Sequence, residues 1–300
     1  MWPEEYSRTA LPQASIREHY GACRRDNLKY TAAVLIVFWA CFFLYAEESI
    51  ENESTRSPYE LSLVLDSTLL AAGGLLYFAS PQVVKRDHSL GEDAYSRDSV
   101  NILDRQATRW YSRNSSKASD HVRDGLLYLP AVFVLCPQMR QAFPDIALLY
   151  VETYLLTSGT TGVLKNAVGR KRPYMYNPSL PRKERDQGDQ NWKSFPSGHT
   201  TAAFTGAVFT STVFSDYFPG SSWKIPVWSA CVTAASLVAY LRVRAGMHFP
   251  TDVVAGGAIG TSGAVLIPYL HRRNRERAAL IIGPGIGGEN GICIGIRGSH

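Results

Sequence analysis

The sequence lacks the features of a disulfide-rich or nucleic-acid-binding protein. Among its 300 residues there are five cysteines, which are scattered, odd in number and free of Cys-x-x-Cys or Cys/His metal spacings. We therefore expect small buried cysteines rather than a disulfide framework, and no metal site. No basic run exceeds three residues or is interleaved with aromatics, and the net charge is only +5. These absences predict no nucleic-acid partner.

Period-two alternation and hairpin signals are also sparse before the C-terminal tail. The apolar segments instead predict an all-α fold, a bundle of about six core helices. The expected helices cover residues 61–80, 125–134, 146–164, 200–214, 226–241 and 253–270. Between the first two, residues 81–123 are expected to form a long charged connection that contains a surface helix.

The chain divides into four parts by composition. Residues 1–29 are polar, and residues 30–46 form an uncharged apolar run between basic and acidic flanks. That pattern predicts a signal peptide or a membrane anchor. Residues 60–270 form the main domain. The tail, 271–300, is assigned no function, and its last residues are of the kind that a cloned tag leaves.

The sequence leaves two locations open. Only 253–270 approaches the roughly 20 apolar residues that span a bilayer. We favour export to the cell envelope, with the domain membrane-associated on the periplasmic side. The alternative is a multi-pass integral membrane protein. The sequence does not indicate an oligomeric state.

Three polar segments at helix ends carry the candidate chemistry. In the first, 165–173, Lys165 and Arg172 follow an apolar helix, and Pro173 ends it. Arginine matches phosphate oxygens with a planar fork, whereas lysine supplies a mobile point charge. Taken alone, this segment is also typical of an ordinary basic helix end, where the positive charges interact favourably with the helix dipole.

The second segment, 196–199, reads Pro-Ser-Gly-His and opens an apolar helix. Backbone N–H groups at a helix N-terminus bind anions. Gly198 lets the backbone approach a phosphate closely, and Ser197 adds a hydroxyl donor. His199 is placed to act as a general acid. The alternative is an N-cap serine with an incidental histidine.

The third segment, 242–252, contains Arg242, His248 and Asp252. His248 and Asp252 are four residues apart, and if a helix begins at Pro250, Asp252 lies in its first turn and can accept a hydrogen bond from the His248 imidazole. That bond would fix the tautomer and leave the other nitrogen free to attack phosphorus. A satisfied loop histidine is the alternative for this segment alone.

Together the three segments resemble the type 2 phosphatidic acid phosphatase (PAP2) and vanadium haloperoxidase superfamily. The family signature K-x6-RP, PSGH, R-x5-H-x3-D is matched at every fixed position. One departure is Leu241, where the family often has serine. The resemblance covers about residues 60–270 and implies a PAP2-like helical bundle with its catalytic loops at one end.

The resemblance also implies residue roles and an activity. His248 would be the nucleophile, Asp252 would orient it, and His199 would be the acid and then the base. The phosphate would be held by Lys165, Arg172, Ser197, Gly198 and Arg242. The implied reaction is metal-independent hydrolysis of a phosphate monoester or pyrophosphate, on a lipid or isoprenoid, through a phosphohistidine.

Alternatives from the same superfamily are a vanadium-dependent haloperoxidase or a non-specific acid phosphatase for soluble esters. No cofactor is expected, although vanadate should bind as a phosphate analogue. The expected partners are a phosphorylated lipid or other phosphate ester and a membrane surface. Three further cations, Arg170, Lys171 and Arg244, are expected to be solvated.

Overall fold

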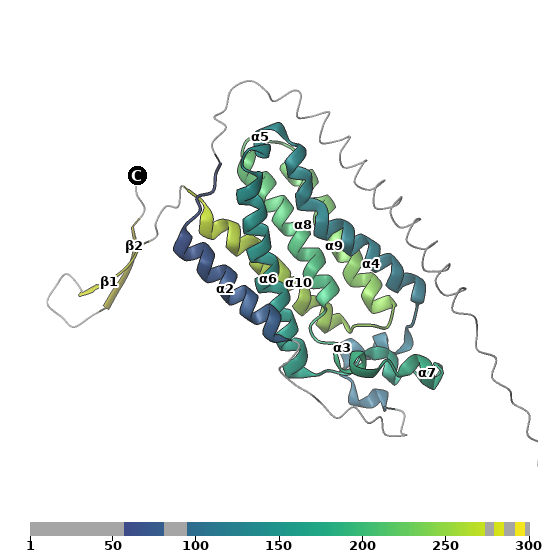
Figure 1. Ribbon diagram of the computed structural model, residues 1–300. Coiled ribbons are helices and arrows are strands. Elements are labelled where there is room, and N and C mark those ends of the chain that lie inside the picture. The colour runs from purple at the N-terminus through teal and green to yellow at the C-terminus, as the bar shows by residue number, and fades with distance from the viewer. Residues whose placement is uncertain (1–56, 81–94, 274–278, 285–291, 298–300) are drawn as a thin grey trace, which may run out of the picture.

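The computed structural model describes residues 57–80, 95–273, 279–284 and 292–297, and its main body is a helical bundle (Figure 1). In this part of the chain the long helices are α2 (Leu63–Ala79), α4 (Arg113–Tyr128), α6 (Phe143–Val168), α8 (Gly198–Tyr217), α9 (Lys224–Arg244) and α10 (Pro250–His271). The short helices are α3 (Ile102–Arg105), α5 (Pro137–Arg140) and α7 (Arg182–Arg185). The predicted all-α bundle of about six core helices is confirmed within these residues.

Two parts of the chain precede and follow the bundle in the sequence. Residues 1–29 and the predicted signal or anchor at 30–46 lie outside the described residues. In the tail, β1 (Ala279–Pro284) and β2 (Ile292–Arg297) pair antiparallel, with Ala279 opposite Arg297. This pair accounts for the period-two alternation of the tail.

The expected separate helix at 125–134 was wrong. Its first residues end α4, and Leu129–Leu135 continues as a 3₁₀ segment. Pro130 has no backbone N–H, so it is compatible with a change of hydrogen-bond pattern there. α4 begins well inside the expected connection, where the Ser112 side chain caps it. The polar N-terminal half of α4 thus lies at the end of the bundle where α3 and α7 are found (Figure 1).

α8 forms the centre of the bundle. It packs against α4, α6, α9 and α10, and residues 200–203 and 205–214 are buried. Its buried hydroxyls bond to backbone carbonyls within the helix, as Thr210 does to Gly206 O (2.8 Å) and Ser211 to Ala207 O (2.9 Å). These bonds satisfy polar groups that would otherwise be costly in the core. The N-terminus of α8 is therefore held among the other helices.

Two helices have the length and composition to cross a membrane. They are α9, with 21 residues, and α10, with 22. The sequence expectation that only 253–270 approaches spanning length was wrong, because α9 extends beyond the apolar run at 226–241. In the most apolar 18-residue stretch of each helix, only 22% of the residues of α9 and 33% of those of α10 are buried inside the protein.

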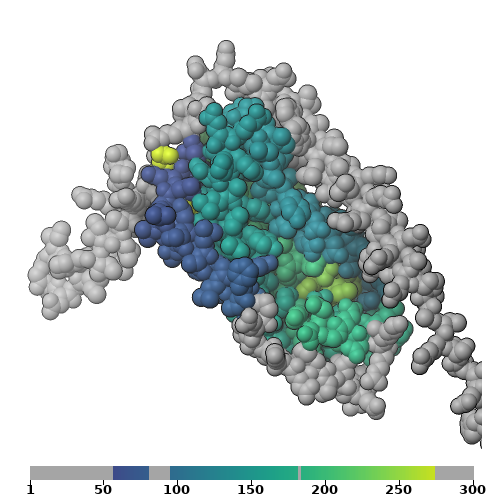
Figure 2. Space-filling model, in the orientation of Figure 1, coloured from purple at the N-terminus to yellow at the C-terminus, as the bar shows by residue number. Residues whose placement is uncertain are grey.

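α2 also directs apolar side chains outward. Leu63 is 87% exposed and Phe78 is 72% exposed. In Figures 1 and 2 α2 lies along α6 on the outside of the bundle. Large apolar surfaces of this kind mark contacts with a membrane or a partner.

The cysteine expectation is confirmed where it can be followed. Cys136 and Cys231 are free and buried. Both behave as small apolar core residues.

Candidate active site

The three predicted segments come together at one end of the bundle. Backbone hydrogen bonds link them directly. Ser194 N donates to Arg170 O (3.0 Å), Ser197 N donates to Asp252 O (3.0 Å), and Tyr174 N donates to Gly246 O (3.0 Å). Residues that are up to 72 positions apart in the sequence are therefore joined by backbone hydrogen bonds at this end of the bundle.

Two glycines shape the turns at this end of the bundle. Gly169 ends α6 in the left-handed region (φ 54°), and its N–H bonds to Lys165 O (3.1 Å). Gly246 has φ 71°, and a Cβ there would lie 2.2 Å from Trp110 O. Glycine adopts such angles without the steric penalty of other residues. The turns place Arg172 and His248 beside the helix ends that carry the other site residues.

His248 is buried, with 1% of its surface exposed. Its Nδ1 lies 2.7 Å from Ser194 O, and a carbonyl can only accept a hydrogen bond, so Nδ1 carries a proton. Burial, followed by the charges of Arg172 and Lys165, holds the pKa of His248 well below its usual range. The ring is therefore neutral at pH 7, and its lone pair is on Nε2.

The expected hydrogen bond from His248 to Asp252 is not formed. Asp252 Oδ2 is 3.8 Å from Nδ1, close enough for charge interaction but too far for a hydrogen bond. The same carboxylate accepts hydrogen bonds from the Ser194 hydroxyl and from Phe249 N (2.8 Å). Asp252 thus fixes the loop residue whose carbonyl orients the imidazole, and its effect on ring orientation is indirect.

Arg170, expected to be solvated, instead ties together two fully buried carboxylates. Its Nη1 lies 2.6 Å from Asp252 Oδ1, and its Nη2 lies 2.7 Å from Asp104 Oδ2. Asp104, in α3, also accepts hydrogen bonds from Thr251 N (3.1 Å) and Thr251 Oγ1 (2.7 Å). The expectation failed because Asp104 lies 66 residues upstream, in a stretch without a recognisable motif.

His199 stands in the first turn of α8 and is paired with a residue that the sequence did not single out. Its Nε2 lies 2.8 Å from Asp120 Oδ1, on α4. Burial and the charges of Arg242 and Arg123 lower the pKa of His199 to about 4, although Asp120 opposes this shift. Burial alone would raise the pKa of Asp120, but its bond to His199 and the neighbouring arginines outweigh burial and lower it. Before an anion binds, the pair is thus a neutral imidazole and a carboxylate.

The signal for Asp120 was present but weak. Ser116, Ser119 and Asp120 follow helical spacing, and all three interact with Arg242. Its Nη1 is 3.1 Å from Ser116 Oγ and 3.6 Å from Asp120 Oδ1. A helical reading of 113–128 would have placed these side chains on one face.

The three predicted cations converge on the same end. Lys165 Nζ donates to Pro196 O (2.7 Å) and Lys193 O (3.1 Å). Burial, followed by the charge of Arg172, lowers the pKa of Lys165 to about 7. Arg172 and Arg242 are 8% and 4% exposed, and the Nε of each is buried without a hydrogen-bond partner among the described residues. Buried positive charge with unused donors favours an anionic ligand.

The start of α8 completes the site. Ser197 Oγ accepts hydrogen bonds from Thr200 N (3.4 Å) and Thr200 Oγ1 (3.0 Å), so its own proton remains available as a donor. A Cβ on Gly198 would meet only Thr161 Cγ2, at 3.8 Å, which is ordinary contact. The neighbouring side chains and backbone in the described part of the chain would therefore leave room for a larger residue at position 198. The N-terminal amides and the helix dipole add positive potential.

This end of the helical bundle gathers buried cations, a neutral histidine and a helix N-terminus, a combination that favours binding of an anion. Residues 146–276 match the model of the PAP2 superfamily. The match contains every predicted site residue. It does not include Asp104 or Asp120.

Several curated proteins are similar over part of the chain. A lipid A 1-phosphatase from Rhizobium etli is 32% identical over 126 residues, which are 41% of this chain and 50% of the relative. A lipid A 4'-phosphatase from Porphyromonas gingivalis is 40% identical over 83 residues, 27% of this chain and 32% of the relative. An undecaprenyl-diphosphatase from Sulfolobus acidocaldarius is 30% identical over 119 residues, 39% of this chain and 50% of the relative. The chain thus spans half or less of the length of these relatives.

Proposed function

We propose that this protein is a metal-independent phosphatase that hydrolyses a lipid or isoprenoid phosphate through a phosphohistidine. The observation that carries the proposal is the state of His248. Its Nδ1 proton is committed to Ser194 O (2.7 Å), so a neutral ring offers Nε2 to an electrophile. Lys165, Arg172 and Arg242 provide the positive charge that would hold the phosphate.

The first chemical step forms a bond from His248 Nε2 to phosphorus and breaks the bond from phosphorus to the ester oxygen. The leaving oxygen takes a proton from His199, which must be protonated in the substrate complex. The phosphate's negative charge offsets the cations that lower the pKa of His199, so substrate binding favours that protonation. Asp120 supports it further through the 2.8 Å bond.

The second step returns the enzyme to its starting state. Neutral His199 takes a proton from water, and the resulting oxygen nucleophile attacks phosphorus. The bond from phosphorus to Nε2 breaks, and inorganic phosphate leaves. During the intermediate, the imidazolium charge of His248 is stabilised by Ser194 O and by Asp252 at 3.8 Å.

The cations and the amides of α8 stabilise charge on the non-bridging oxygens. Loss of one donor of this kind typically costs about 3–4 kcal/mol in the transition state. A metal ion is not required for this charge neutralisation. Vanadate should bind the same donors as a phosphate analogue.

A lipid substrate is supported by two independent features. Three relatives are named as lipid A phosphatases or an undecaprenyl-diphosphatase. The exteriors of α2, α9 and α10 are apolar, which suits association with the membrane that holds such substrates. We place the site on the periplasmic side, as the predicted signal or anchor at 30–46 favours.

The substrate class is tested by phosphate release from micellar phosphatidic acid, an isoprenoid diphosphate and p-nitrophenyl phosphate. We expect kcat/KM to be highest for one of the lipids. A preference for the soluble ester would favour the acid phosphatase alternative. Vanadate should inhibit hydrolysis, whereas vanadate-dependent halide oxidation would favour the haloperoxidase alternative. Release from membranes by a carbonate wash would exclude the multi-pass arrangement.

A further inference from the structure

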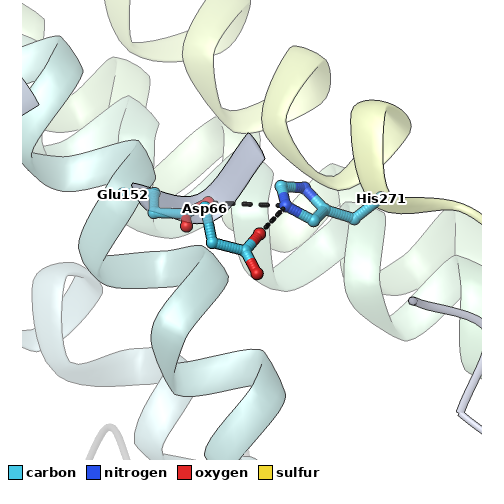
Figure 3. A group of neighbouring side chains, drawn as sticks. All are labelled: Asp66, Glu152 and His271. Carbon is cyan, nitrogen blue, oxygen red and sulfur yellow. Dashed lines mark hydrogen bonds and ion pairs between the residues drawn. The ribbon is translucent and has the colours of Figure 1, made fainter. Parts of the chain in front are cut away.

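A second group of ionisable side chains lies at the other end of the bundle, near the C-terminus of α10. Figure 3 shows its three members. The group consists of Asp66 on α2, Glu152 on α6 and His271 on α10. His271 Nε2 is 2.7 Å from Asp66 Oδ1 and 3.7 Å from Glu152 Oε2. All three residues are buried, and their ligand atoms lie within 4.8 Å of one another. We call this group the three-helix cluster.

The three-helix cluster is separate from the candidate active site. Asp252 stands in the first turn of α10 and His271 is its last residue. At about 1.5 Å of rise per residue, the helix separates them by roughly 28 Å. The proposed phosphatase reaction uses none of the three residues, so the cluster needs its own explanation.

Two of the three side chains are held in place by hydrogen bonds to backbone groups outside the cluster. His271 Nδ1 lies 2.8 Å from Ile267 O and therefore carries a proton, which directs Nε2 towards the carboxylates. Asp66 Oδ2 accepts a hydrogen bond from Ser62 N (3.0 Å), which leaves Oδ1 facing His271. Metal-binding histidines typically donate their second ring N–H to a carbonyl or carboxylate in this way.

Glu152 supplies the independent sign that a ligand belongs here. Its side chain is 0% exposed, and neither carboxylate oxygen has a hydrogen-bond partner among the described residues. In that part of the chain, the ion pairs of Glu152 and Asp66 go only to His271. A buried carboxylate without hydrogen bonds is costly. Two carboxylates and one neutral imidazole balance the charge of one divalent cation.

We propose that Asp66, Glu152 and His271 bind one divalent cation of the zinc type, which fastens α2 to α6 and α10. One imidazole nitrogen and two carboxylate oxygens suit such a cation. Bonds of about 2.0–2.2 Å place ligand atoms about 3.3 Å apart in a tetrahedron. The 3.7 Å pair is near this value, and the 2.7 Å pair must open by about half an ångström. Because the ligands are buried, the role is structural, and it does not depend on the proposed phosphatase activity.

The test is a Co²⁺ titration of the purified, metal-depleted full chain in detergent micelles. We expect about one equivalent to bind with a visible ligand-field absorption, and Zn²⁺ to displace it. Glu152→Gln keeps the shape of the side chain but removes its charge, and should weaken binding at least about tenfold. The matched control is Asp216→Asn, which removes a carboxylate paired with Arg272 at the same end and should leave binding unchanged.

A second variant keeps the proposal testable if Glu152→Gln fails to fold. The double variant His199→Ala, His248→Ala alters only the catalytic end and should bind Co²⁺ as the wild type does. If the double variant no longer bound Co²⁺, the metal would be bound at the catalytic end of the bundle, and the proposal would be overturned. The proposal also fails if the wild type binds no saturable equivalent, or if Glu152→Gln binds equally well. In those cases the cluster is a proton-bearing ion pair between His271 and the carboxylates.

Discussion

His199 Nε2 and Asp120 Oδ1 lie 2.8 Å apart, joining the first turn of α8 to the polar half of α4. The contact brings a residue from outside the family-matched region to the histidine expected to protonate the leaving group. Asp120 raises the pKa of His199 against burial and the arginine charges, which lower it to about 4. A general acid is effective when its pKa lies near the working pH.

Asp120→Asn should therefore move the alkaline limb of the kcat profile to lower pH. The substitution removes the anionic partner that favours the protonated form of His199, so that form is lost at a lower pH. At pH 7 kcat should fall by about tenfold, which is less than the roughly 10²–10⁴-fold that general acid catalysis supplies in full, because His199 itself remains. The measurement is kcat against pH for the preferred ester.

The matched control for this variant is Asp124→Asn, one turn further along α4, where the carboxylate pairs with Arg123 (2.7 Å). Asp124→Asn should leave the alkaline limb of the kcat profile at the same pH as in the wild type. Asp120→Glu should restore part of the shift. An unchanged profile in Asp120→Asn would mean that the contact does not tune His199.

The sequence predicted the grouping of its motif residues because their chemistry is local. A helix N-terminus at Ser197 and a basic helix end at Lys165 can be recognised from a few neighbouring residues. Asp120, Asp104 and the three-helix cluster are different, since each depends on packing between helices far apart in the chain. Asp66 and His271 are 205 residues apart yet in contact, which no spacing rule detects.

The predicted hydrogen bond between His248 and Asp252 is not formed, for a related reason. The four-residue spacing from His248 suggested a direct hydrogen bond, but Phe249 N and Ser194 Oγ occupy the carboxylate instead. The capping arrangement at the start of α10 competes for the same oxygens. Only the structure reveals that competition.

Arg170→Gln should destabilise the fold. The substitution leaves Asp104 and Asp252, both with 0% exposed side chains, without their cation. Breaking a buried pair in this way costs about 3–5 kcal/mol. Denaturant unfolding of the purified chain measures the loss, with Lys117→Gln as the control, because Lys117 is exposed. A loss no larger than that of Lys117→Gln would contradict the role assigned to Arg170.

Gly246→Ala should also destabilise the protein, by roughly 1–3 kcal/mol. The new Cβ would lie 2.2 Å from Trp110 O, at a φ of 71°. Gly220→Ala is the control, because a Cβ there meets nothing within 4 Å. Thermal unfolding of both variants makes the comparison, and equal melting temperatures would show that the turn relaxes without strain.

Anion binding should weaken as pH rises through about 7, the pKa to which burial lowers Lys165. The lysine is charged below this pKa and neutral above it, so a dianion loses one attraction on the alkaline side. Sulfate is the suitable probe because its charge is constant near neutral pH. Its inhibition constant should rise above pH 7 in the wild type and stay flat in Lys165→Arg. The same rise in both proteins would assign the effect to another group.

The most direct test of the central claim is to trap the phosphorylated enzyme. A radiolabelled substrate is mixed with the purified full chain and quenched in alkali, where a phosphohistidine survives and phosphate esters of carboxylates do not. The label should map to His248, be absent in His248→Ala, and persist in the control His121→Ala. Label on another residue, or unchanged labelling of His248→Ala, would contradict the assigned nucleophile.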